Sequence, residues 1–308
     1  MAGNHDPMSP QALFGHVQDA DYFHVPRSLA PETHGHISLP QPLIKEEPLW
    51  TAHTGVPLID QAMEPLEMRF TKFMLLEVVV AVGCIVLFSL IALRMRGGGA
   101  PKGKLWNMFE AMLLFIRDEV ARPAIGKHDA DRFLPFLWTM FFFVLGCNLL
   151  GMVPWMGSAT GALATTGALA LCTFGVVLGS GMAKLGVVGF WKAQVPHMDL
   201  PIVLAIPLIP MIFAIEILGM LIKHFVLAVR LLANMMAGHV VLSVLLAFIA
   251  VAGMAVESYA HPMFLGISAA SVLGAVALSL LELFVAFLQA YIFTFLSALF
   301  IGMAVHPH

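Results

Sequence analysis

Long apolar runs separated by short polar links dominate this chain from about residue 70 onward. The runs cover residues 70–93, 133–155, 161–182, 199–255 and 263–305. A helix needs about 20 apolar residues to cross a bilayer. The pattern therefore predicts an all-α polytopic membrane protein with about five membrane-crossing helices. A further stretch mixes apolar and charged residues at helical spacing and predicts an amphipathic helix along the membrane interface, at residues 105–126.

The last two apolar runs are too long for helices that cross a membrane perpendicularly. As a straight helix, residues 199–255 would extend about 80 Å, whereas the hydrocarbon core is about 30 Å thick. This segment must tilt steeply, bend near Pro207 and Pro210, or both. Polar residues 257–262 separate the two runs. We therefore expect residues 199–305 to form a strongly tilted antiparallel hairpin.

Composition supports this fold class and narrows the partners. The chain is 59% hydrophobic and 11% charged, whereas soluble domains carry about 25% charged residues. A net charge of −3 without a basic stripe argues against nucleic acid as a partner. Residues 1–66 contain nine of the 19 prolines and six of the 13 histidines. We interpret them as an exposed, partly irregular extension of a membrane domain spanning residues 67–308.

Neither a metal nor a cofactor is expected. His34 and His36 lie close together in the extension, but they lack nearby carboxylate or thiolate partners. The three cysteines have no metal-type or redox-type spacing. The sequence also lacks the phosphate-binding loop GxxxxGK[ST], so the chain has no nucleotide chemistry of its own.

The distribution of basic residues predicts the orientation in the membrane. The links after the first and third runs carry Arg94, Arg96, Lys102, Lys104, Arg117, Arg122, Lys127 and Arg132, and Lys184 and Lys192. Residues 156–160 and 253–263 carry no lysine or arginine. Basic links face the cytoplasm. We therefore expect the N-terminal extension outside and the C-terminus in the cytoplasm.

A few polar residues interrupt the last two runs at membrane depth. They are Glu216, Lys223, Arg230, Asn234, His239, Glu282 and Gln289. A charge near the bilayer centre costs about 2.5–3.5 kcal/mol on insertion scales. A hydrogen bond between membrane helices contributes only about 0.6 kcal/mol on average. These residues are therefore functional candidates, although a packing role remains the simplest alternative for each.

The predicted hairpin brings two pairs of these residues to matching depths. The midpoint between Arg230 and Gln289, like that between His239 and Glu282, falls near residue 260 in the polar turn. Glu282 and Gln289 are seven residues apart and share a helix face. Arg230 and Asn234 share one as well, whereas His239 lies about 180° from Arg230. If the hairpin is twisted, this mismatch is smaller. The alternative is that His239 faces a different cavity from Arg230.

The residue types suggest two different tasks. An amide such as Gln289 or Asn234 would orient the guanidinium of Arg230 without neutralising it, so Arg230 could attract an acid on another molecule. His239 and Glu282 both exchange protons when burial shifts them towards neutral pH. We interpret this second pair as part of a proton path, with a buried static ion pair as the alternative.

Four segments resemble subunit a of the F-type ATP synthase. VRLLANMMAGH at residues 229–239 is similar to the family's arginine–leucine–aromatic–small–asparagine signature, with Leu232 in place of the aromatic residue. CNLLGMVPW at 147–155 resembles the motif of the second span. IEILGMLIK at 215–223 and ELFVAFLQAYIFTFLSALFIG at 282–302 resemble the acidic segment and the last helix.

This resemblance implies a role for each matched residue. Arg230 corresponds to the stator arginine that faces a carboxylate of the c-ring, and Asn234 to its neighbouring asparagine. Glu216 corresponds to the acidic residue of the cytoplasmic half-channel. His239, Glu282 and Gln289 correspond to the proton path on the outer side, and Asn148 matches a polar position in the second span.

The resemblance further implies a place in the membrane sector of a rotary ATP synthase. There the chain would conduct protons through two half-channels that Arg230 separates, between c-ring subunits, peripheral-stalk b subunits and lipid. A bacterial inner membrane is the expected location. The main alternative is a secondary transporter or anion-binding channel with an arginine at its midplane, although no internal repeat is visible. Motifs of an intramembrane hydrolase are missing from the membrane stretches.

Overall fold

A computed structural model of the chain describes residues 19–24, 36–41, 70–95, 103–153, 156–194, 202–256 and 261–306. Most of the predicted extension, including His34, and the polar turn at 257–260 lie outside these residues. Five helices in the described part are long and apolar enough to cross a membrane. They are α3 (Lys72–Met95), α6 (Ala130–Gly151), α7 (Leu163–Leu185), α9 (Ile202–Met254) and α10 (Pro262–Val305). The all-α polytopic fold predicted from the sequence is confirmed, with helix ends within about four residues of those expected.

Shorter elements complete the described fold. They are the strands β1 (Tyr22–His24) and β2 (His36–Ser38), the helices α4 (Lys104–Phe115), α5 (Arg122–Ile125) and α8 (Val187–Ala193), the π-helix η1 (Ile116–Ala121) and the 3₁₀ helix η2 (Ala159–Gly161). The two strands pair antiparallel, with Phe23 opposite Ile37. Beside them, the side chain of Gln41 bonds both the backbone nitrogen and the carbonyl oxygen of Phe70. The described parts of the extension therefore hold the start of α3.

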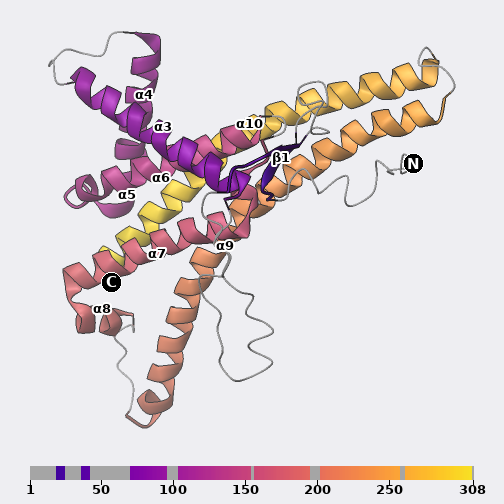
Figure 1. Cartoon of the computed structure of the whole chain (residues 1–308). Coiled ribbons are helices and arrows are strands. Elements are labelled where there is room, and N and C mark those ends of the chain that lie inside the picture. The colour runs from indigo at the N-terminus through magenta and orange to yellow at the C-terminus, as the bar shows by residue number, and fades with distance from the viewer. Residues whose placement is uncertain are drawn as a thin grey trace.

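Helices α9 and α10 form the expected hairpin. Figure 1 shows that they run side by side towards their connection, where they project from the other helices as an arm. Helix α9 changes direction about midway along its length, and its other leg diverges from α10 (Figure 1). This bend shortens the span of a 53-residue helix. The clearest bend lies farther along α9 than the two prolines at which we expected it.

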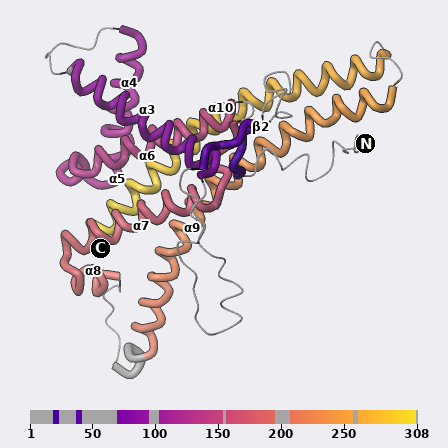
Figure 2. Tube along the Cα trace, in the orientation of Figure 1, coloured from indigo at the N-terminus to yellow at the C-terminus, as the bar shows by residue number. Residues whose placement is uncertain are grey.

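The hydrophobic core lies where α10 crosses the other helices. Its largest fully buried side chains include Leu137 of α6, Leu227 and Leu231 of α9, and Phe293 and Ile301 of α10. The tube in Figure 2 shows α6, α7 and the C-terminal half of α10 converging in this region, on the opposite side from the arm. The core therefore anchors one end of the hairpin.

The segment predicted as an interfacial helix consists of α4, η1 and α5 in succession. Its apolar side chains Ile116, Val120 and Ile125 are buried, whereas Arg117 and Asp118 are about one-third exposed. This division confirms the amphipathic pattern. The sequence did not reveal the π-helical turn at its centre.

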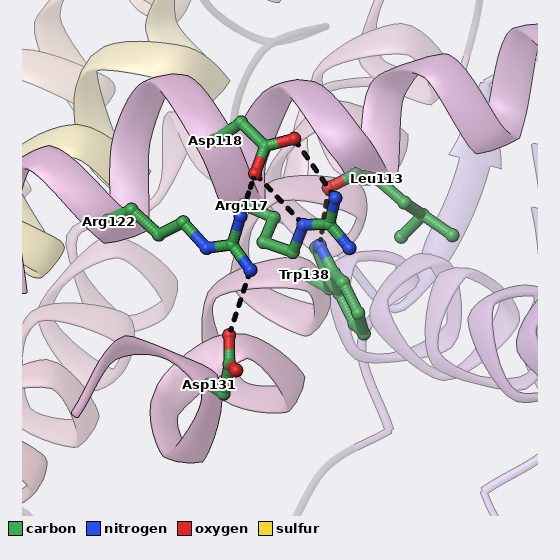
Figure 3. A network of polar contacts seen from close by, with 6 residues as sticks. All are labelled: Leu113, Arg117, Asp118, Arg122, Asp131 and Trp138. Carbon is green, nitrogen blue, oxygen red and sulfur yellow. Dashed lines mark hydrogen bonds and ion pairs between the residues drawn. The ribbon is translucent and has the colours of Figure 1, made fainter. Parts of the chain in front are cut away.

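A charged network fixes this segment against α6 (Figure 3). Asp118 accepts hydrogen bonds from Arg117 at 3.0 Å and from Arg122 at 2.7 Å, and Arg122 reaches Asp131 at 3.9 Å. The hydrogen bond from Arg117 is the main cause that lowers the pKa of Asp118, with a further contribution from Arg122. In addition, the ring nitrogen of Trp138 on α6 donates a hydrogen bond to the carbonyl oxygen of Leu113 on α4 at 3.0 Å.

A second ionic cluster joins three helix ends. The carboxylate of Asp129, just before α6, receives Lys184 of α7 at 2.5 Å and His306, just after α10, at 3.1 Å. The hydrogen bond from Lys184 is the largest cause that lowers the pKa of Asp129. In Figure 1 the C-terminal end of α10 accordingly lies beside the end of α7. This cluster holds α10 at the end farthest from the arm.

Candidate proton-path site

Two close contacts define the register of the hairpin. A methyl group built on Gly238 of α9 would lie 2.5 Å from Oε1 of Glu282, so this carboxylate packs directly against the backbone of α9. Farther along the arm, a methyl group on Gly274 would lie 3.6 Å from Leu245. Both pairs have their midpoint near residue 260. The register predicted from the sequence is therefore confirmed.

The face that carries Glu282 and Gln289 is buried. These side chains are only 6% and 4% exposed, and Ala286 between them is buried as well. The shared face predicted from their spacing is therefore confirmed. Both side chains point into the helix assembly, where polar groups need partners.

Three polar atoms near the hairpin interface have no hydrogen bond to any described residue. They are Nε2 of His239, Oε1 of Glu282 and Nε2 of Gln289. His239 and Glu282 therefore match in depth but do not bond one another. Gly238, one position before His239, is the residue that faces the carboxylate directly. The rotational mismatch visible in the sequence accounts for this arrangement, because depth alone does not bring two side chains onto facing surfaces.

Asn148 has a different position from the other candidates. It is fully buried on α6, and both ends of its amide are bonded. Its Nδ2 donates to the carbonyl oxygen of Ala286 at 3.2 Å, and its Oδ1 accepts from Thr160 at 2.8 Å. The hydroxyl of Ser158 lies 3.1 Å from that of Thr160. This polar cluster attaches η2 and α6 to α10 one turn beyond Glu282.

Arg230 lies on the outside of the helix assembly. Its side chain is exposed, and it has neither a hydrogen bond nor an ion pair with any residue that the structure describes. The bond to Asn234 or Gln289 expected from the sequence is therefore not formed. The exposed positions of α9 around it carry apolar or small side chains, at Val226, Ala233, Ala237 and Val241.

Glu216 lies on the other leg of α9 and is also exposed. It is 14 residues before Arg230 in the sequence. Lys223, between them, is exposed as well. The described structure thus places an acidic and two basic residues along the outer surface of α9, separate from the buried face of α10.

Two buried or half-buried titratable groups are not among the candidates inferred from the sequence. His224 is 5% exposed between the rings of Phe174 and Phe300, with its Nδ1 2.8 Å from the carbonyl oxygen of Met220. Glu77 is half-buried in α3 and accepts a hydrogen bond from Thr165 at 2.6 Å. Glu77 was recognisable in the sequence, because it is a carboxylate inside an apolar run.

Together, the fold and these residues define a multi-pass, all-α membrane protein. On the surface of its longest described helix it carries an arginine that has no partner among the described residues. A buried carboxylate and amide lie on the helix paired with it. The sequence model of the ATP synthase A chain family matches residues 74–302, which include every candidate residue. The chain belongs to this family.

Individual relatives agree with this assignment. The chain is 47% identical over 211 residues to ATP synthase subunit a of Myxococcus xanthus, a match that covers 68% of this chain and 64% of the relative. It is 45% identical over 212 residues to the same subunit of Chloroherpeton thalassium, covering 69% and 58%. For Anaeromyxobacter dehalogenans the identity is 44% over 211 residues, covering 68% and 50%. The matched segment thus spans about half to two thirds of these relatives.

Proposed function

We propose that this chain is the stationary proton-conducting subunit of a rotary ATP synthase in a bacterial inner membrane. The observation that carries the proposal is the position of Arg230, which is exposed and unpaired in the described structure, next to small or apolar exposed side chains. An isolated charge at membrane depth is costly, so it calls for a partner outside this chain. The partner that we propose is a carboxylate on a ring of c subunits.

In the proposed mechanism, protons move between the outer side and the ring through the region of His239, Glu282 and Gln289. The free ring nitrogen of His239 and the free carboxylate oxygen of Glu282 can accept and release a proton without first breaking a fixed bond within the described chain, and the free amide nitrogen of Gln289 can donate a hydrogen bond in the same path. Asn148 acts as a positioning residue, because both ends of its amide are already bonded and it holds α10 at Ala286.

A protonated ring carboxylate is neutral and rotates through the lipid. When it reaches Arg230 the positive charge favours its ionised form, so the proton leaves towards Glu216 and the cytoplasm. Asn234 flanks the arginine on α9. Each charge that crosses the membrane releases about 2.3 kcal/mol per 100 mV, and this energy turns the ring. Arg230 separates the two half-channels and thereby prevents a direct leak.

The orientation and remaining partners belong to the same proposal. The N-terminal extension faces outside and the C-terminus faces the cytoplasm, in agreement with the basic links in the sequence. Peripheral-stalk b subunits hold the chain stationary. Family membership favours this function over the transporter and the anion channel considered above.

The direct test is Arg230→Ala in the complete synthase. We expect ATP-driven proton pumping by inverted membrane vesicles to disappear while the subunit still assembles with the ring. Val226→Ala, one turn earlier on the same exposed surface of α9, is the matched control and should pump normally. Pumping at the normal rate in the Arg230 variant would refute the stator role.

A further inference from the structure

Helix α3 carries a carboxylate that the mechanism above does not use. Glu77 is five residues after Lys72, the first residue of α3, and so lies about 7.5 Å along the helix. It is half-buried and accepts a hydrogen bond from the hydroxyl of Thr165 on α7 at 2.6 Å. Within the described part of the chain, no lysine, arginine or histidine forms an ion pair with it.

The residues next to Glu77 contact η2, and the polar residues of η2 are in turn connected to α10. Leu76, the residue before it, packs in one apolar cluster with Ala159 of η2. Ala159 lies between Ser158 and Thr160, whose hydroxyls continue the hydrogen-bonded chain to Asn148. Asn148 in turn bonds α10 one turn beyond Glu282. This buried cluster of hydroxyl and amide groups therefore contacts α10 near Glu282, and it lies next to the apolar contact that Leu76 of α3 makes with Ala159.

The energetics argue against a purely structural role. A hydrogen bond between membrane helices offsets only a fraction of the cost of placing a carboxylate inside a membrane span. A second threonine or a serine in place of Glu77 would make a similar helix contact without that cost. The carboxylate is therefore better explained by its ability to take up and release a proton.

We propose that Glu77 collects protons at the outer mouth of the path that leads to Glu282. This inference rests on the proposed function and on the orientation assigned to the chain. The ionised carboxylate binds a proton from water on the outer side, releases it towards the carboxylate of Glu282, and returns to its ionised form. Asn148 and the hydroxyls around η2 hold this region in place. Thr165 orients the carboxylate through its hydroxyl hydrogen bond.

Few other titratable groups face Glu77 from the elements around it. On α6 the thiol of Cys147 lies within electrostatic range. On α3 itself, Lys72 marks the outer end of the helix, with its ammonium 5.2 Å from the ring centre of Phe73. The only charged residue of α7, Lys184, is at the opposite end of that helix, and η2 contains no titratable residue. The carboxylate of Asp19 accepts a hydrogen bond from the backbone nitrogen of Phe73 at the start of α3. A change in outer pH can therefore act here through Asp19 and Glu77, and the variants of Glu77 separate the two.

The test uses the complete synthase in liposomes whose lumen corresponds to the outer side. ATP synthesis is measured at fixed membrane potential and external pH while the luminal pH is varied. Glu77→Gln keeps the hydrogen-bond acceptor but cannot titrate, so we expect synthesis to fall about tenfold at a luminal pH of about 8 and to recover at about pH 5.5. Glu77→Asp should retain most of the activity. Thr165→Val leaves the carboxylate in place and should have less than half of this effect.

Three results would overturn the inference. The first is normal synthesis by Glu77→Gln at every luminal pH. The second is an equal loss in Glu77→Gln and Thr165→Val that does not depend on luminal pH, because this is the result expected of a packing contact. The third is an unchanged pH profile in a histidine variant, which can be measured even if the glutamine variant fails to assemble. Glu77→His introduces a group that titrates at a higher pH, so an unchanged midpoint of the luminal pH profile would exclude proton collection.

The proposed function can be refuted independently of this inference. Arg230→Ala, measured in the same liposomes, should abolish synthesis at every luminal pH. If it does not, the stator role is wrong irrespective of Glu77. If it does and the Glu77 variants behave normally, only the inference about Glu77 is wrong.

Discussion

The contact between Gly238 and Glu282 makes a strong prediction about proton transport. In Gly238→Ala, the added methyl group would lie 2.5 Å from Oε1 and 2.9 Å from Cδ of Glu282. Ordinary van der Waals contact begins near 3.4 Å. The carboxyl group therefore has to move by about 1 Å. Because it is the far end of a flexible side chain, the cost lies at the low end of the range of about 1–3 kcal/mol for overpacking. Alanine recovers about 1 kcal/mol through its higher helix propensity, so we expect the subunit still to assemble.

Transport should suffer far more than assembly. A displacement of about 1 Å in a reacting group costs up to about 10²-fold in rate. We therefore expect ATP-driven proton pumping to fall at least about tenfold in inverted vesicles, normalised to the amount of assembled subunit. Pumping is followed by the quenching of a pH-sensitive dye.

Gly274→Ala is the matched control for this experiment. Gly274 lies on the same hairpin, but a methyl group there would be 3.6 Å from Leu245, an ordinary contact. This variant should pump within about twofold of the unmodified protein, because substitutions without a steric clash usually change stability by less than about 0.5 kcal/mol. If both glycine variants pump normally, the position of Glu282 against α9 does not matter for transport, and the path proposed here is wrong.

Three further substitutions test the packing, the ionic cluster and the proton path. In Gly302→Ala, the added methyl group would overlap the backbone of α5, so the amount of subunit in the membrane should fall several-fold. Gly266→Ala on the same helix is the control, because a methyl group there meets nothing within 4 Å. Asp129→Asn removes the carboxylate that joins three helix ends and should lower the melting temperature of the detergent-solubilised subunit; an unchanged melting temperature at neutral pH would contradict this. Because the folded protein lowers this pKa, the stabilisation is present above the ordinary value of about 4 and disappears as the pH falls through the lowered value. Exchanging His239 and Glu282 should restore more pumping than either single change retains, and a double variant no better than the single ones would show that the two residues are not coupled.

Much of the fold was accessible from run length and spacing alone. Apolar runs near bilayer length gave the spans, and the polar residues near position 260 gave the register that Gly238 and Glu282 confirm. Helical spacing also placed Glu282 and Gln289 on one buried face. These features depend on local periodicity, which a single sequence contains.

Features that depend on the rotation of one helix against another were not accessible. Arg230 and Gln289 match in depth, but the first is exposed and the second is buried, so they do not meet. The attachment of Asp129 to Lys184 and His306 joins residues that are distant in the chain, and nothing in their local sequence indicates it. Such contacts follow from tertiary packing.

The same helix rotation explains how a carboxylate and an arginine coexist in one hairpin without forming a fixed ion pair. Gly238 lets Glu282 approach α9 eight residues beyond Arg230, which is about 12 Å along the helix axis. At that separation and an effective dielectric constant of about 20, two opposite charges attract by about 1.4 kcal/mol, against about 4 kcal/mol in direct contact. Arg230 and Glu282 therefore do not neutralise one another, and the guanidinium stays available to a carboxylate that arrives from outside the chain.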